Sequence, residues 1–347
     1  MLEQNELKLD FKDVLIVPKT SQIKSRNDVV LNTSLKFSNT SFTWDGIPIM
    51  AANMDTIGTF EMAIELYKHK IFTCIHKHYS VTDWLNFYSN PNVDNNIFNY
   101  IAITCGITEK DLLLLSEIID KLPQINFISL DVANGYTEDF MNSVKHIRQK
   151  YPTKIIIAGT VVTPEITKEL ILNGANIVRI GIGGGSVCTT RKKTGVGYPQ
   201  LSAILECADA AHQVNGYIVS DGGCTCPGDF GKAFGAGADF VMIGGLLSGH
   251  KESGGNLIER DGQLFKQFYG MASQTAMDKY NNGKSNYKTD EGKTVLIPYK
   301  GPVENTILDI LGGIRSTCTY VGAKHLYELH SKTTFIRVSQ QLNNFFN

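Results

Sequence analysis

The sequence lacks an excess of either charge and any long apolar run, and each absence excludes a class of protein. Lys and Arg total 33 against 34 Asp and Glu, so the formal net charge is -1 and no bulk positive field would attract nucleic acid. No window approaches the roughly 18 to 20 apolar residues that a bilayer span needs. Hydrophobic residues make up 42% and charged residues 19%, a globular balance. We therefore expect a globular protein that binds neither nucleic acid nor membrane.

Signals for export and for a zinc site are also missing. The first six residues contain neither the basic nor the apolar region of a secretion signal. The seven cysteines are odd in number and widely spaced, which is typical of a reducing compartment. Cys224 and Cys226 form a close pair, but no second pair follows at zinc-site spacing, so both are interpreted as ordinary thiols. A cytoplasmic location is expected.

Apolar, β-branched runs alternate with amphipathic helical patterns from about residue 47 onward. The predicted strands are 47–53, 72–76, 100–105, 127–131, 154–158, 177–181, 217–220 and 240–243. The predicted helices include 60–68, 110–122, 138–151, 164–173, 201–214, 227–234 and 304–311. Several strands, such as 154–158, are continuously apolar, which is typical of parallel strands that are buried on both faces.

Eight βα units in series predict an α/β protein with a (β/α)₈ barrel, and a doubly wound open sheet is the alternative. No linker interrupts the series, so residues 1–347 are interpreted as one barrel domain with an N-terminal extension and a C-terminal tail. The stretch 246–302 does not follow the alternation, and its polar, glycine-rich part spans 281–293. A long loop without structure of its own predicts a mobile flap over about 275–295, between the last strand and the last helix.

Polar and glycine residues recur at the carboxyl ends of the predicted strands, where barrels carry their chemistry. These ends are 53–55, 76–78, 131–134, 181–183, 221–223 and 244–245. Any one of them alone is also explained as a turn, but together they predict one site. Asp221, Gly222 and Gly223, with Gly244 and Gly245, follow the last two strands, where barrels most often bind phosphate through backbone N–H groups.

A glycine-rich loop follows the sixth strand and ends in Cys188, Thr189, Thr190 and Arg191. A thiol in such a loop is a candidate nucleophile, because Arg191 and nearby amides would lower its pKa. A structural thiol is the alternative interpretation. Closely spaced loop carbonyls would also suit a monovalent cation.

Five motifs make the chain similar to one family. They are Gly183-Gly-Gly-Ser-Val-Cys-Thr-Thr-Arg191, Ala51-Ala-Asn-Met-Asp55, Ser220-Asp-Gly-Gly223, Tyr269-Gly-Met271 and Gly312-Gly-Ile-Arg-Ser316. Together they resemble the motifs of the IMP dehydrogenase/GMP reductase family, and the resemblance extends from Leu9 to Arg337. Gly184 departs from the proline that the family usually carries.

The resemblance is stronger to the reductase branch than to the dehydrogenase branch. Family dehydrogenases usually carry a regulatory domain after the second strand and an arginine–tyrosine flap that activates water. Here no extra domain fits after Ser80, and no arginine occurs between Arg260 and Arg315. The alternatives are oxidation of IMP by a dehydrogenase and a non-catalytic purine nucleotide-binding barrel.

The resemblance implies a reaction that converts GMP and NADPH to IMP, ammonia and NADP⁺, with Cys188 forming a covalent thioimidate with the purine. It implies a proton relay of Thr190 and Glu291. It also implies a catalytic Lys77, which would either orient the nicotinamide or assist proton transfer. The alternatives are a loop-capping Thr190, a solvated Glu291 and a surface Lys77.

The resemblance also implies ligand-binding residues and a homotetramer. The residues implied for GMP or IMP are Asp221, Gly222, Gly223, Gly244, Gly245, Gly270, Met271, Ala272, Lys288, Glu291 and Gly292. Those implied for NADPH are Ser25, Arg26, Lys77, Asp131, Val132, Ala133, Ile182, Gly183, Met271, Tyr287, Lys288, Ser316, Thr317, Cys318 and Thr319, some of them from a neighbouring subunit. Those implied for potassium are Gly183, Gly185, Cys188, Thr190 and Arg191. Relatives often carry arginine at position 288.

Overall fold

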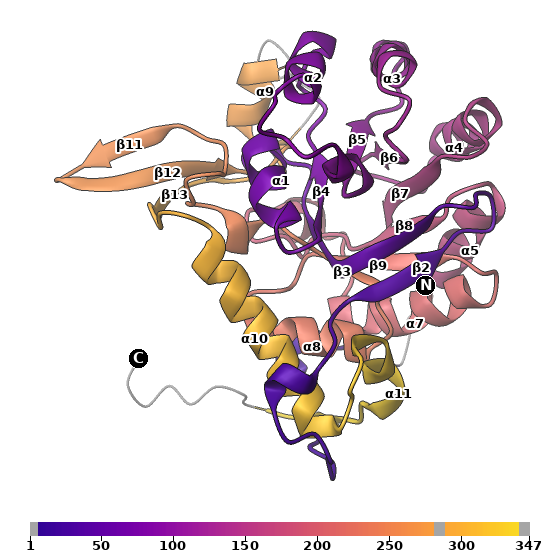
Figure 1. Ribbon diagram of the computed structural model, residues 1–347, viewed down its shortest axis with the longest axis vertical. Coiled ribbons are helices and arrows are strands. Elements are labelled where there is room, and N and C mark those ends of the chain that lie inside the picture. Colours follow the sequence, from indigo (N-terminus) through magenta and orange to yellow (C-terminus); the bar gives the residue numbers. More distant parts are fainter. Residues whose placement is uncertain (1–5, 281–288, 340–347) are drawn as a thin grey trace.

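The computed structural model describes residues 6–280 and 289–339, and its centre is a closed barrel of parallel strands. The barrel strands follow one another in chain order, and the last pairs with the first, so the ring closes (Figure 1). They are β3 (Thr43–Ala51), β4 (Ile71–Ile75), β5 (Ile101–Cys105), β6 (Phe127–Asp131), β7 (Ile155–Val161), β8 (Ile177–Ile180), β9 (Tyr217–Asp221) and β10 (Phe240–Ile243). The predicted (β/α)₈ barrel is confirmed, and each predicted strand overlaps an observed one.

Helices surround the barrel, as Figure 1 shows. They are α1 (Phe60–Tyr67), α2 (Val81–Tyr88), α3 (Glu109–Lys121), α4 (Glu138–Lys150), α5 (Pro164–Leu172), α7 (Gln200–His212), α8 (Pro227–Gly235) and α10 (Glu304–Val321). Their starts are encoded locally. Ser80 and Thr108 accept backbone N–H bonds at the starts of α2 and α3, and Asp83 and Asp111 complete capping boxes there.

Helix α10 continues ten residues beyond its predicted end. The prediction ended the helix at Leu311, directly before Gly312 and Gly313. In the structure Gly313 lies against Pro227 of α8, and a Cβ at position 313 would be 2.3 Å from the Pro227 Cβ. The glycine therefore permits close packing of two helices instead of ending one.

The prediction that 246–302 lacks structure of its own is wrong. This stretch contains an antiparallel sheet of β11 (Leu257–Arg260), β12 (Gln263–Tyr269) and β13 (Thr294–Pro298). Helix α9 (Gln274–Tyr280) lies between β12 and β13 in the chain. Figure 1 shows the sheet projecting from the barrel. Asp261 and Gly262, both with positive φ, connect β11 to β12, and Asp-Gly is a strong hairpin signal. Of the expected flap, 275–280 is helical, 294–295 is in β13, and 281–288 lies outside the described residues.

Segments near the two ends of the described chain pair with each other. Strand β1 (Val14–Ile16) pairs antiparallel with β14 (Phe335–Arg337). Strand β2 (Thr33–Lys36) extends the main sheet by pairing antiparallel with β3. Short helices complete the described chain: α6 (Thr190–Thr194), α11 (Leu329–Lys332) and five 3₁₀ turns at Phe11–Asp13 (η1), Arg26–Asp28 (η2), Asn95–Asn99 (η3), Gly245–Leu247 (η4) and Leu326–Glu328 (η5). Within residues 6–280 and 289–339, none of the helices is long and apolar enough to cross a bilayer.

Aromatic side chains form much of the barrel interior. Phe127 is fully buried, and its ring meets Phe37, Phe42 and Phe72 edge to face at centroid distances of 6.1, 5.9 and 4.8 Å. Such pairs stabilise beyond simple area burial. Phe127 of β6 therefore packs together Phe72 of β4 with Phe37 and Phe42, which lie between β2 and β3 in the chain.

Replacing Phe127 by Ala should reduce the free energy of unfolding by about 3–5 kcal/mol, because the variant loses buried area and leaves a cavity. The urea midpoint measures this loss. Leu113→Ala is the matched control, since Leu113 is 61% exposed on α3, and its midpoint should barely move. Equal midpoints for the two variants would show that the aromatic cluster contributes little.

Candidate functional site

A cavity of about 480 Å³ opens at the carboxyl ends of the barrel strands. Its wall brings together half of the site residues that the sequence singled out. Predicted residues in the wall are Lys77, Asp131, Val132, Ala133, Ile182, Gly183, Gly185, Cys188, Thr190, Asp221, Gly270, Met271, Ala272 and Glu291. Residues that are up to 214 positions apart in the chain therefore share one site, in the place where barrels carry their chemistry.

Cys188 lies in this wall on the loop between β8 and α6. Its Sγ is 3.1 Å from the Thr190 Oγ1, and the residue is half-buried. The other cysteines are elsewhere: burial raises the pKa of Cys74, Cys207 and Cys318 to about 12, which keeps these thiols protonated. All seven cysteines lie in the described ranges, and Cys188 is the one that reaches the cavity.

Backbone pairing fixes Glu291 beside the cysteine. Gly292 forms bridges with both Cys188 and Ser273. The Thr189 N–H donates to the Glu291 carbonyl at 2.8 Å, and the Glu291 N–H donates to the Ala272 carbonyl at 3.0 Å. A Cβ on Gly292 would be 3.0 Å from the Ser273 nitrogen, so only glycine fits without displacement. Three segments that are distant in sequence are thus held together at the cavity.

Arg191, which was expected to lower the pKa of the thiol, has other partners. Its Nη1 is 3.2 Å from the Asp10 Oδ2, and its Nη2 donates to the Tyr198 carbonyl. Its stem packs on Gly183, where a Cβ would be 2.5 Å from the Arg191 Cγ. The hydrogen-bond partner that the structure gives to Cys188 is therefore Thr190.

Lys77 contributes a cation from the loop after β4. Its Nζ is 3.5 Å from the Asp111 Oδ1, and its side chain is 40% exposed. Asp111 is itself held by the capping box of α3. The ammonium group is thus anchored weakly and remains accessible to a ligand in the cavity.

Glycine turns gather beside the cysteine loop. The Gly223 N–H donates to the Gly184 carbonyl at 3.0 Å, and Gly222 and Gly223 both have positive φ. A Cβ on Gly245 would be 2.4 Å from the Ser186 Oγ. Two of the predicted phosphate turns therefore converge on residues 184–186, with backbone that other residues adopt poorly.

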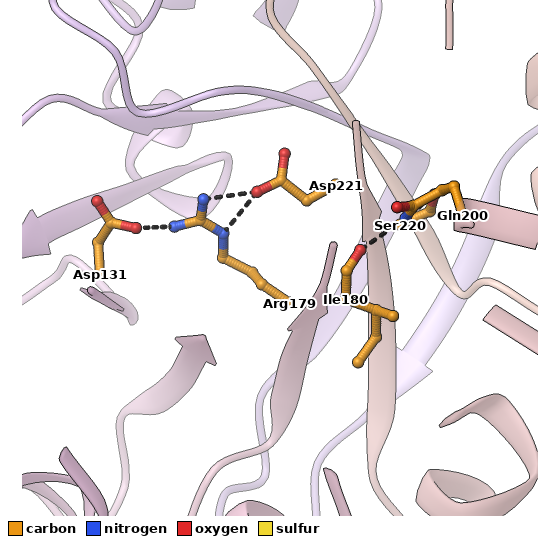
Figure 2. A network of polar contacts seen from close by, with 6 residues as sticks. All are labelled: Asp131, Arg179, Ile180, Gln200, Ser220 and Asp221. Atoms are coloured by element: carbon orange, nitrogen blue, oxygen red, sulfur yellow. Dashed lines mark hydrogen bonds and ion pairs between the residues drawn. The ribbon is translucent and has the colours of Figure 1, made fainter. Parts of the chain in front are cut away.

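A buried arginine that the sequence reasoning missed lies in the same wall. Arg179 of β8 donates through Nη2 and Nε to the Asp221 Oδ2 at 2.6 and 3.2 Å, and through Nη1 to the Asp131 Oδ1 (Figure 2). Burial opposes its charge, but the two carboxylates raise the pKa of Arg179 above its ordinary value. The detectable signal was a cation inside the apolar run 177–180.

Asp55 organises a second polar cluster next to the cavity. Its Oδ2 accepts bonds from the Tyr269 hydroxyl (2.5 Å), the Tyr280 hydroxyl (2.6 Å) and the Lys279 Nζ (2.9 Å). Burial alone would raise the pKa of Asp55, but these donors hold it below its ordinary value. The cluster anchors the end of α9 to the loop after β3. No sequence pattern indicated Tyr280, which lines the cavity.

Two histidines near this cluster are uncharged at neutral pH. Burial lowers the pKa of both His76 and His78 to about 4. The His78 ring stacks on Tyr280 with centroids 3.4 Å apart. Lys77 and Arg179 therefore supply the positive charge of the described cavity wall.

Several predicted cofactor residues lie away from this cavity. Ser25 and Arg26 are at η2, which packs against α10, the helix that carries Ser316, Thr317, Cys318 and Thr319. The Cys318 side chain is fully buried and belongs to the core. Tyr287 and Lys288 lie outside the described residues. The predicted cofactor set thus divides into a cavity group and a group on α10.

The predicted potassium residues lie on the cysteine loop. Over the described ranges, no group of three or more His, Cys, Asp or Glu side chains could hold a metal ion. Gly183, Gly185 and Cys188, whose backbone carbonyls were predicted to hold potassium, all line the cavity. The Gly185 carbonyl also accepts the Cys188 N–H at 3.0 Å.

Comparison with known proteins gives full-length similarity. The family described as "IMP dehydrogenase / GMP reductase domain" matches residues 8–343. A GMP reductase of Caenorhabditis elegans is 59% identical over 99% of this chain and 95% of its own length. GMP reductase 2 of Homo sapiens is 59% identical over 99% and 97%, and a GMP reductase of Phytophthora infestans is 57% identical over 99% and 94%.

The match of the family over nearly the whole chain agrees with the closed barrel and with the cavity around Cys188. The chain is an oxidoreductase and belongs to the IMP dehydrogenase/GMP reductase family.

Proposed function

We propose that this protein reductively deaminates GMP to IMP and ammonia with NADPH as the reductant, a step of purine nucleotide salvage in the cytoplasm. The observation that carries the proposal is Cys188, which lies in the cavity wall 3.1 Å from Thr190 and is paired through backbone to the Glu291 segment. The similarity to proteins named GMP reductase supports the same conclusion. The absence of arginine between Arg260 and Arg315 favours it over IMP oxidation.

GMP would bind across the cysteine loop. The Asp221 carboxylate would accept hydrogen bonds from the ribose hydroxyls. Gly222, Gly223, Gly244 and Gly245 would bind the phosphate through backbone N–H groups. Gly270, Met271 and Ala272 would join these glycines at the phosphate. Lys288, Glu291 and Gly292 would meet the edge of the base, with its C2 atom near the Cys188 sulfur. Glu291 and Gly292 are already held at the cavity by backbone bonds.

The dinucleotide would use both groups of predicted residues. Lys77, Asp131, Val132, Ala133, Ile182, Gly183 and Met271 line the cavity and would bind the nicotinamide end. Residues 25–26, 287–288 and 316–319 would bind the remainder, partly from a neighbouring subunit of a homotetramer. Potassium would be held by carbonyls of Gly183, Gly185 and Cys188, with Thr190 and Arg191 beside them.

Side chains of this protein would carry out the steps at the GMP base. The Cys188 sulfur adds to the purine C2. The bond between C2 and the exocyclic amino nitrogen then breaks, and the amino group leaves as ammonia. An amine leaves poorly unless it is protonated, so a proton must reach it, and Thr190 and Glu291 would deliver that proton. NADPH supplies the hydride to C2 when it is bound. The C2–S bond then breaks and frees the thiolate, while Lys77 orients the nicotinamide.

The absorbance of the reduced nicotinamide, followed over time, tests the proposal directly. With purified protein, NADPH should be consumed only when GMP is present, and IMP should accumulate in equal amount. Formation of NADH from IMP and NAD⁺ would instead establish the dehydrogenase. Binding of GMP without either reaction would indicate a non-catalytic nucleotide-binding barrel.

Replacing Cys188 by Ala should reduce turnover at least about a thousandfold with little loss of GMP affinity, because the nucleophile is removed but the binding residues remain. Stopped assays measure the rate, and calorimetry measures the affinity. Cys226→Ala is the control, because Cys226 is an exposed cysteine outside the cavity wall, and it should retain full activity. Substantial turnover by the Cys188 variant would contradict covalent catalysis.

Replacing Glu291 by Gln should slow ammonia release by about a hundredfold, because the amide cannot pass a proton to Thr190. Hydride transfer should slow much less, so rapid-quench and NADPH-absorbance traces should separate. Asp290→Asn is the matched control, since Asp290 is adjacent and pairs with Lys193 at 3.3 Å. If both steps slowed equally in the Glu291 variant, the relay would be refuted.

A further inference from the structure

One guanidinium connects two carboxylates that belong to different parts of the site. Arg179 contacts Asp131 at the end of β6 and Asp221 at the end of β9, as Figure 2 shows. Under the proposed function, Asp131 faces the nicotinamide end of NADPH and Asp221 faces the GMP ribose. The residue is therefore placed to act on two ligands that arrive independently.

A glycine on the neighbouring strand leaves room for the contact between Arg179 and Asp131. Arg179 lies in β8, and β7 separates that strand from β6. At the facing position of β7 the chain has Gly159, where a Cβ would be 2.6 Å from the Arg179 Cβ. The missing side chain at position 159 leaves the space beside the arginine stem, so the guanidinium can reach Asp131.

Charge and burial make the arrangement rigid. The Arg179 side chain is 7% exposed, whereas those of Asp131 and Asp221 are 31% and 20% exposed. A buried guanidinium without both carboxylates would be strongly disfavoured, and a planar fork holds two acceptors in fixed directions. The cation is therefore locked between the carboxylates rather than free to move with solvent.

Each carboxylate keeps one oxygen outside the ion pairs. Asp131 uses Oδ1 and Asp221 uses Oδ2 toward the arginine, and in Figure 2 the second oxygen of each points away from it. Both side chains line the cavity. The second oxygens can therefore accept hydroxyl hydrogen bonds in directions that the guanidinium determines.

We infer that Arg179 is a positioning residue that orients Asp131 toward the dinucleotide and Asp221 toward the nucleotide, so that binding of both ligands depends on this one side chain. The inference rests on the proposed function, because that function supplies the two ligands. Arg179 itself touches neither ligand and acts through the two carboxylates.

A purely structural arginine is the rival explanation, and the chain contains one for comparison. Arg148 on α4 is partly buried, and it bonds the Gly174 carbonyl at 2.9 Å, the Lys154 carbonyl at 2.8 Å and the Asn176 Oδ1 at 2.5 Å. Among the described residues, the hydrogen-bond partners of Arg148 all lie outside the cavity wall. Arg148→Lys is therefore the matched control for Arg179→Lys.

The experiment measures the affinities for GMP and for NADP⁺ separately, by calorimetry on the full chain. GMP and NADP⁺ are used because these two ligands do not react with each other. Arg179→Lys should weaken both affinities at least about tenfold, because a point cation cannot hold two carboxylates as a fork does. Asp221→Asn should weaken mainly GMP, and Asp131→Asn mainly NADP⁺. Arg148→Lys should lower the melting temperature but leave both affinities unchanged.

Wild-type affinities in Arg179→Lys, or a loss confined to one ligand, would overturn the inference. If that variant does not fold, Asp131→Asn provides the second test. Its GMP affinity should fall about threefold, because the Arg179 guanidinium then has a carboxylate on one side only and orients Asp221 less firmly. An unchanged GMP affinity in this variant would refute the positioning role. A wild-type chain that binds neither ligand would refute the proposed function and this inference with it.

Discussion

The pairing of β10 with β3 is the constraint from which the site follows. It joins Val241–Ile243 to Ile49–Ala51 and turns an open sheet into a ring. In a ring of parallel strands all carboxyl ends open on the same side, so loops from every part of the chain meet there. Asp131, Cys188 and Asp221 reach one cavity for this reason, although 90 positions separate the first from the last. An open sheet would have spread them along an edge.

Backbone bonds, more than side chains, then set the fine geometry. Gly292 contacts the backbone of both the cysteine loop and the 270–273 turn, and these contacts place Glu291 in the cavity wall. Backbone pairing is insensitive to which side chains flank it, so it leaves the Glu291 side chain free of a structural task. Backbone also joins the Gly222–Gly223 turn to the cysteine loop, through the bond from the Gly223 N–H to the Gly184 carbonyl.

The sequence was sufficient for the barrel because its buried parallel strands are continuous apolar runs; the predicted and observed limits of β6 and β10 agree. It was insufficient where tertiary contact overrides local preference. The predicted helix stopped at Leu311, but α10 continues through Gly312 and Gly313, and Gly313 packs closely on Pro227. Asp261–Gly262 did encode the hairpin of β11 and β12, and the long polar stretch around it obscured the signal. Arg179 is a cation inside an apolar run, but its role depends on two carboxylates that are distant in sequence, and Tyr280 belongs to no pattern that the sequence shows.

The Asp55 cluster has a consequence for the rim of the cavity. Tyr280 is fixed to Asp55, and Glu291 is fixed to Ala272 and Thr189, so the chain leaves and re-enters the rim of the cavity at two anchored points. Each anchor is made to a partner on the barrel side: Asp55 follows β3, and Thr189 follows β8. The rim therefore keeps its shape through bonds that do not depend on the residues joining the two anchors.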